Sequence, residues 1–210
     1  MEIIKKVFSI ESYGFDSNCY VVGTDKITII DTGASDSHSK RILEAIERLG
    51  LDSSKISKII ITHKHPDHSG GLRGLLKLLP SNSITIYAHK LGIKYYGELD
   101  NLKGLNENDI LDLDGLEFKV IYTPGHTEDG ICLYNQENKI LISGDTVFSG
   151  GNIGRTDLPG GNMKILVNSI EKLVELDVEF LLPGHMTFVV EGNKHIKQSL
   201  RFAKSCIGFY

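Results

Sequence analysis

Six consecutive residues in the first third of the chain include four side chains that can bind a metal ion: His63, His65, Asp67 and His68. They directly follow an apolar run, residues 56–61, which is typical of a buried strand. Neutral imidazole and carboxylate together suit zinc, iron or manganese. The sequence therefore predicts a metal site at the end of this strand.

The spacing of the four side chains favours two ions over one. His63 and His65 are two residues apart, so both rings can reach one ion from an extended or turning segment. Asp67 and His68 follow a bend favoured by Pro66 and would point to a neighbouring position. Since one ion rarely accepts four ligands from so short a segment, we expect two adjacent ions. The alternative is a polar loop that opens a helix, with Asp67 as its cap.

Three further candidate ligands share one context, the exit of an apolar strand. They are His126 after the expected strand 116–122, Asp145 after 139–143, and His185 after 179–182. A glycine precedes each of them, which allows close approach of the backbone. Each residue alone would be assigned a structural role, but together with the first cluster they indicate a ligand set.

Composition limits the other functions. The chain has 210 residues, 40% of them hydrophobic, a net charge of -4 and a sequence pI near 6.1. This balance argues against nucleic-acid and anionic-membrane partners, and no apolar run approaches membrane-spanning length. The N-terminus lacks a signal pattern, so we expect a cytoplasmic protein that acts on a small molecule. A homodimer is kept as an open alternative. Cys19 and Cys132 lie in apolar runs and are expected to be buried free thiols.

The periodicity predicts alternating strands and helices in a single domain, 1–210. Strands are expected at 3–10, 18–23, 26–31, 56–61, 83–88, 109–113, 116–122, 130–134, 139–143 and 179–182. Helices are expected at 37–49, 70–79, 162–176 and 193–204. A weak internal repeat appears in this order: each half has a hairpin, an acidic residue at its exit, a helix, and a strand that ends in histidine.

Four motifs, 62–68, 124–127, 144–146 and 183–185, resemble in type and order those of the metallo-β-lactamase fold superfamily. The resemblance implies an α+β fold, a four-layer αββα sandwich with a two-metal site. By analogy, the first ion is held by His63, His65 and His126, the second by Asp67, His68 and His185, and Asp145 bridges them. Asp31 matches a further motif that implies support from behind the ligands; the alternative is a turn-stabilising carboxylate.

The segment 144–161 is similar to the hydroxyacylglutathione hydrolase (glyoxalase II)-like group. This resemblance implies a metal-dependent hydrolase that uses a metal-bridging hydroxide on a thioester, such as S-lactoylglutathione or a related acyl-thiol. Asp67 and Asp145 would be catalytic, because they fix the hydroxide while holding the metals. The expected cofactors are two divalent metal ions, zinc foremost, with iron or manganese as alternatives. Arg155 is expected to pair with Asp157 and brace the loop; contact with an anionic substrate is the alternative.

The second hypothesis belongs to another reaction class. Mononuclear non-haem iron sulfur (persulfide) dioxygenases of the same fold resemble the chain through His63, His126 and Asp145, a set that suits iron. A third hypothesis is a non-catalytic, metal-binding relic of the fold.

Other residues are expected outside the site. His38 and His195 are expected at the surface, whereas His89 follows a strand. Tyr95, Tyr96 and Tyr122 are expected in packing, with a substrate groove as the alternative. None of these residues is expected to have a catalytic role.

Overall fold

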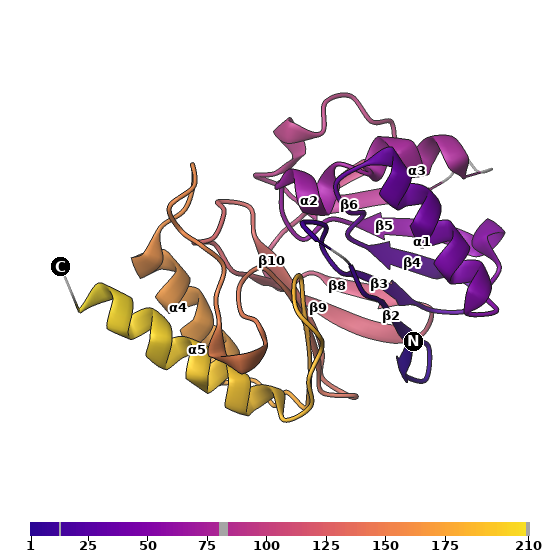
Figure 1. The fold of residues 1–210 in the computed structure, drawn as a ribbon. Coiled ribbons are helices and arrows are strands. Elements are labelled where there is room, and N and C mark those ends of the chain that lie inside the picture. The colour runs from indigo at the N-terminus through magenta and orange to yellow at the C-terminus, as the bar shows by residue number, and fades with distance from the viewer. Residues whose placement is uncertain (13, 80–83, 209–210) are drawn as a thin grey trace. The chain divides into compact units, whose positions relative to one another are not determined.

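The computed structural model describes residues 1–12, 14–79 and 84–208. The chain divides into two compact units, the first Met1–Leu105 with Asp112–Leu116 and the second Asn106–Leu111 with Glu117–Tyr210. Figure 1 draws the chain as a ribbon coloured from the N-terminus to the C-terminus. The single-domain assignment stays a prediction.

The first unit is built on a seven-stranded sheet in the order β1 to β7. β1 to β4 pair antiparallel, and β4 to β7 pair parallel. The strands are β1 (Glu2–Ile4), β2 (Val7–Ile10), β3 (Cys19–Val22), β4 (Ile27–Ile30), β5 (Ile56–Ile60), β6 (Thr85–His89) and β7 (Leu102–Leu105). The helices are α1 (Asp36–Arg48), α2 (Pro66–Ser69) and α3 (Leu72–Leu78), with short 3-10 turns η1 (Ser53–Lys55) and η2 (Ile93–Tyr95).

Helices α1 and α3 lie side by side on this sheet (Figure 1). The Ser35 side chain caps α1 by accepting a hydrogen bond from the amide of His38, which satisfies an otherwise unpaired donor of the first turn. Ile42 and Leu75, one from each helix, are fully buried in a shared apolar cluster with strand residues such as Ile29. Burial of this apolar face holds the helices on the sheet.

The second unit is built on a five-stranded sheet in the order β12-β11-β10-β9-β8. Its strands are β8 (Ile110–Leu113), β9 (Leu116–Tyr122), β10 (Ile131–Asn135), β11 (Ile140–Gly144) and β12 (Phe180–Pro183). Helices α4 (Met163–Val174) and α5 (Gly192–Ile207) pack on each other (Figure 1), and a 3-10 turn, η3 (Ser149–Gly151), precedes them. Ile170 of α4 and Ile196 of α5 are buried in one cluster with Leu141 and Leu181 of the sheet.

Both units contain the repeated element order predicted from the sequence. In the first, the antiparallel pair β3–β4 leads through α1 to β5, which pairs parallel with β4. In the second, the antiparallel pair β10–β11 leads through α4 to β12, which pairs parallel with β11. Because parallel neighbours end at the same edge of a sheet, residues that follow β4 and β5, or β11 and β12, come together within their unit.

Several predicted boundaries are wrong. The expected strand 3–10 is two strands, because Lys6 adopts φ 67° and turns the chain back on itself. The expected helix 70–79 is α3, and α2 precedes it with Pro66 at its first turn. Strand β7 was not predicted. Residue 83, the first of the expected strand 83–88, lies outside the described residues. Among the helices of the described ranges, none is long and apolar enough to cross a membrane.

Candidate metal centre

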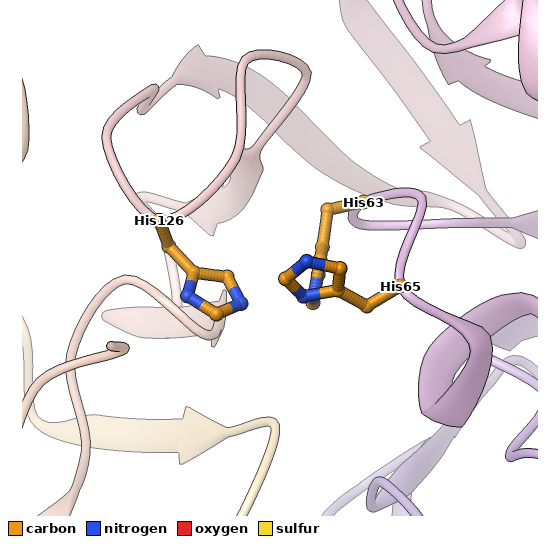
Figure 2. A group of neighbouring side chains, drawn as sticks. All are labelled: His63, His65 and His126. Carbon is orange, nitrogen blue, oxygen red and sulfur yellow. The ribbon is translucent and has the colours of Figure 1, made fainter. Parts of the chain in front are cut away.

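The first unit brings together the four side chains of the loop after β5. His63 and His65 leave one turn with ring centroids 4.9 Å apart, and Figure 2 draws these two with His126. The His63 and His68 ring centroids are 4.0 Å apart, and His68 Nε2 lies 3.8 Å from Asp67 Oδ2. His63 and His68 are buried, whereas His65 and Asp67 are half-buried. The loop is therefore a compact cluster of imidazoles and a carboxylate.

Asp31 organises this cluster from behind. It follows β4, is 2% exposed and adopts the left-handed conformation at φ 61°. Its carboxylate accepts hydrogen bonds from the Thr62 amide at 2.8 Å and the Thr62 hydroxyl at 2.8 Å, and lies 2.7 Å from His68 Nδ1. A non-glycine residue in this conformation is held there by its surroundings, as is common at functional sites.

The hydrogen bonds to Asp31 determine which ring nitrogens carry protons. A carboxylate only accepts, so His68 Nδ1 donates to it and the lone pair of a neutral ring is on Nε2. The Thr62 hydroxyl gives its proton to Asp31 and can accept from His63 Nδ1, 3.2 Å away. The lone pair of His63 is then also on Nε2. Thr62 thus connects Asp31 with the His63 ring. The sequence pattern did not single out Thr62.

The second unit brings together the three later candidates, His126, Asp145 and His185. Asp145 Oδ2 lies 3.4 Å from His126 Nε2 and 3.5 Å from His185 Nε2. Asp145 follows β11 and His185 follows β12, whose parallel pairing sets them side by side. His126 reaches the same edge because β9 ends beside the start of β10, and β10 starts beside the end of β11.

His126 is oriented by a backbone group. Its Nδ1 lies 2.7 Å from the carbonyl oxygen of Arg155, so Nδ1 carries a proton and, in the neutral ring, the lone pair on Nε2 faces Asp145. Gly154 makes this approach feasible, since a Cβ there would lie 2.0 Å from the carbonyl oxygen of Asp145 and 2.9 Å from the His126 ring. The sequence pattern did not reveal this carbonyl, and only the adjacent glycine signals it.

A buried polar network lies beneath Asp145. The hydroxyls of Thr123 and Thr146 are 2.9 Å apart, and the Cys132 thiol lies 3.4 Å from the Thr146 hydroxyl and 3.4 Å from the Ser143 carbonyl oxygen. Burial raises the pKa of Cys132 to about 11, so this thiol stays protonated. Cys19 is also a buried free thiol, as predicted for both. This network holds Thr146, the residue that follows Asp145, in place.

Arg155 forms the pairing that the sequence favoured. Its Nε and Nη2 donate to the two carboxylate oxygens of Asp157 at 2.8 and 2.6 Å. These hydrogen bonds lower the pKa of Asp157 to about 2. Both side chains are about two-thirds exposed, so the pair braces a surface loop.

Two histidine expectations are resolved by burial. His38 is not at the surface: it is 3% exposed, and its Nδ1 lies 2.8 Å from Asp16 Oδ2. The Asp16–His38 pair connects the loop before β3 with the start of α1. The two residues are far apart in the sequence, so no local pattern predicts their contact. His195 is half-buried and accepts a hydrogen bond from the Gly150 amide. Neither of these two contacts involves a candidate ligand.

The donor set fits divalent metal ions. In a neutral His126 the lone pair of Nε2 faces a carboxylate oxygen at 3.4 Å, and a neutral His68 presents the same combination with Asp67 at 3.8 Å. Two acceptors held face to face repel each other, and a cation between them converts the repulsion into coordination. Imidazole rings fixed through their second nitrogen are the usual arrangement of metal-binding histidines.

Comparisons with known proteins point the same way. A family model described as the metallo-beta-lactamase superfamily matches residues 12–185. Hydroxyacylglutathione hydrolase GloC of Haemophilus influenzae is 31% identical over 209 residues, which cover 91% of this chain and 94% of that protein. Atrochrysone carboxyl ACP thioesterase of Aspergillus fumigatus is 25% identical over 187 residues, 88% of this chain and 55% of that protein.

Solved structures add two matches. The structure of TTHA1623 in a di-iron-bound form is 27% identical, has a TM-score of 0.72 and covers 90% of this chain and 96% of that chain. The metallo-beta-lactamase family protein TTHA1429 of Thermus thermophilus is 18% identical, has a TM-score of 0.79 and covers 97% of this chain and 81% of that chain. The second match concerns the fold alone.

Proposed function

The chain belongs to the metallo-β-lactamase superfamily, and from that premise we propose that it hydrolyses thioesters of small thiol carriers with the help of two divalent ions. The family match and the structural matches confirm the predicted α+β metallo-β-lactamase fold. Hydroxyacylglutathione hydrolase relatives identify the chain as a hydrolase. The substrate, the ligand assignment and the two ions are the proposed part.

The observation that carries the proposal is the position of Asp145. One of its oxygens lies within 3.5 Å of the metal-binding nitrogen of both His126 and His185. A carboxylate placed between two imidazoles can serve two ions at once, which is the role of a bridging ligand. We assign His63, His65 and His126 to one ion, Asp67, His68 and His185 to the other, and Asp145 to both.

When bound, such a pair of ions supplies a hydroxide at neutral pH and polarises the carbonyl group that is attacked. The chain's own residues provide the rest. Asp31 and the Arg155 carbonyl hold the rings of His68 and His126 in the correct tautomer, and Asp67 and Asp145 orient the nucleophile electrostatically. Preorganised groups of this kind need no rearrangement during the reaction.

A thioester suits this set of residues for a chemical reason. The leaving group is a thiolate, which is only weakly basic, so its departure needs little help from a general acid. Two relatives of this chain are named for thioester substrates, one on glutathione and one on an acyl carrier protein. We therefore propose that the acyl-thiol bond is the bond that is cleaved, and we specify no acyl group.

The test combines metal content with turnover. Protein purified without added metal is analysed for zinc, iron and manganese, and hydrolysis of S-lactoylglutathione is followed by loss of its thioester absorbance. We expect two ions per chain and hydrolysis that a chelator abolishes. His65→Ala should lower both metal content and rate, whereas His195→Ala, the control, should change neither. One iron per chain with oxygen uptake on glutathione persulfide, and no hydrolysis, would establish the dioxygenase alternative instead.

A further inference from the structure

A buried histidine of the first unit has no part in the mechanism proposed above. His38, in the first turn of α1, is 3% exposed, and its Nδ1 lies 2.8 Å from Asp16 Oδ2. A carboxylate only accepts hydrogen bonds, so at this distance Nδ1 carries a proton. The His38 ring also lies against the backbone of Gly33, where an added Cβ would be 2.3 Å from the ring. The ring is therefore held between a carboxylate and the main chain.

Asp16 makes a second contact through its other carboxylate oxygen. Its Oδ1 accepts a hydrogen bond from the amide of Ala34 at 2.9 Å. Ala34 ends the segment 31–34, which leads from β4 towards α1. Because the Asp16 side chain is only 19% exposed, solvent screens these contacts less than those of a surface pair. One carboxylate thus connects the segment 31–34 with the side chain of His38.

The residue after Asp16 contacts the loop that follows β5, residues 62–68, which we call the histidine loop. The Ser17 amide donates to the carbonyl oxygen of the proposed ligand Asp67 at 3.1 Å. Ser17 is fully buried, so this hydrogen bond is shielded from water. Asp16 and Ser17 therefore join the segment 31–34 to the backbone of the histidine loop.

The segment 31–34 in turn holds the histidine loop directly. The amide and the hydroxyl of Thr32 both donate to the carbonyl oxygen of His68, at 2.7 and 3.0 Å. Asp16 thus reaches His68 through the segment 31–34 and reaches Asp67 through the neighbouring Ser17. Asp67 and His68 are both assigned to the ion that they share with His185, called the second ion below.

Net stability is a poor explanation for the Asp16–His38 pair. Both groups lose hydration when they are buried, so a pair of this kind contributes little to folding. Helix α1 also has other supports: Ser35 caps it through the His38 amide, and Ile42 is buried in the apolar cluster on the sheet. What the pair does provide is a fixed position for a segment that contacts the histidine loop.

We propose that the Asp16–His38 pair is a positioning element for the second ion. It fixes the segment 31–34 and the backbone of Asp67, and so the directions in which Asp67 and His68 present their donor atoms. The inference rests on the proposed function, from which it takes the ligand assignment, and it deepens that function. Neither Asp16 nor His38 contacts the ion or the substrate in this proposal.

The first test removes the pair and measures the affinity for each ion. In His38→Leu, an apolar side chain of similar size leaves Asp16 without its partner. The protein loaded with metal is titrated with a chromophoric chelator. We expect the affinity for one of the two ions to fall about tenfold, as is usual when residues that orient ligands are changed. Unchanged affinities would overturn the proposal, and so would an equal loss of both ions, which a general loosening of the fold produces.

Two matched variants separate position from stability. In His38→Asn, the side-chain nitrogen can replace Nδ1 as the donor to Asp16, so both affinities should be within about twofold of those of the unmodified protein. Ile46→Val changes a fully buried residue of the same helix and lowers stability without touching the pair. It should retain both ions. Loss of an ion in Ile46→Val to the same extent as in His38→Leu would overturn the proposal.

A double variant identifies the ion on which the pair acts. His185→Ala removes a proposed ligand of the second ion. Adding His38→Leu to it should lower the metal content no further, because the pair acts through that ion. A further loss of metal would show that the pair supports the other ion or the fold, and would contradict the proposal. Should His38→Leu fold poorly, Asp16→Ala removes both contacts of the carboxylate and is measured in the same way.

The two proposals can fail separately. If the unmodified protein binds two ions but hydrolyses no thioester, the proposed substrate is wrong, and the affinities still decide whether the pair positions the second ion. If hydrolysis is normal and both His38→Leu and Asp16→Ala keep both affinities, only the role of the pair is wrong. A protein that never holds more than one ion would overturn both.

Discussion

At the scale of single residues, the Asp31 carboxylate contacts two residues of the histidine loop, Thr62 and His68. This carboxylate favours a proton on Nδ1 of His68 directly, and through the Thr62 hydroxyl it favours a proton on Nδ1 of His63. The contacts of Asp31 fit both roles weighed for it, support of the proposed ligands and stabilisation of a turn. This is possible because the ligands themselves form the turn.

Asp31→Asn tests this influence. Asparagine tolerates the left-handed backbone at this position, so the turn should persist, but one of the acceptors for Thr62 and His68 becomes a donor. We expect metal affinity to fall roughly 10- to 100-fold, measured by competition with a chromophoric chelator. Asp52→Asn, at an exposed turn of the same unit, is the control. Unchanged affinity in Asp31→Asn would show that the tautomers are set in another way.

Arg155→Ala tests the loop brace. The pKa of Asp157 is lowered to about 2 by its bonds to Arg155, so the pair stabilises the folded state above the ordinary carboxyl pKa near 4 and loses this effect as pH falls toward 2. The variant should have a slightly lower Tm at pH 7, a difference that shrinks in acid. Metal content should not change, since His126 bonds to the backbone of residue 155. Loss of metal would assign the side chain a direct role.

At the scale of elements, Asp114, in the turn between β8 and β9, attaches residues 112–116 to the rest of the first unit. Its side chain accepts hydrogen bonds from the Thr24 and Asp25 amides at 3.0 and 3.3 Å, and Lys6 Nζ lies 3.0 Å away. The Thr24 amide and then Lys6 lower the pKa of this carboxyl to about 2. These contacts connect Asp112–Leu116 with the turn between β3 and β4 within the first unit.

Asp114→Asn should weaken that attachment. The side chain keeps its shape but loses its charge, so we expect the free energy of unfolding to fall by roughly 1 kcal/mol at pH 7. Because the folded pKa is depressed, the difference from the unmodified protein should shrink as pH falls from about 4 toward 2. Urea denaturation across this range measures it, with Glu117→Gln as the control. A difference that persists in acid would point to packing instead of charge.

At the scale of the whole molecule, the sequence indicated candidate ligands and said little about what surrounds them. That Asp145 and His185 lie together could be predicted, because each follows an apolar strand and parallel neighbours end at one edge. The contact of His126 with the Arg155 carbonyl could not be predicted, because every residue has a backbone carbonyl and the sequence does not show which one is used. The contact of Lys64 with the Tyr95 ring could not be predicted either, since it depends on where η2 lies relative to the histidine loop.

Metal removal tests the molecule as a whole. Ions that bind only the folded state stabilise it by RT ln(1 + [M]/Kd), about 2.7 kcal/mol at a free concentration 100 times Kd. In a chain of this size each kcal/mol corresponds to roughly 2–4 °C in Tm, so treatment with a chelator should lower Tm by several degrees, reversibly on adding metal. Calorimetry with and without chelator measures this. An unchanged Tm would mean that the folded state does not hold the ions.

The acceptor that holds His126 is a peptide oxygen, and this has an evolutionary consequence. No substitution of the side chain at position 155 can delete that acceptor, so the arginine is free to drift among descendants of this chain. The sequence constraint lies one residue earlier, at Gly154, because any methyl group added there would collide with the main chain of Asp145. Lineages that keep the chemistry should therefore keep a glycine at this position, and searches based on charged side chains would overlook it.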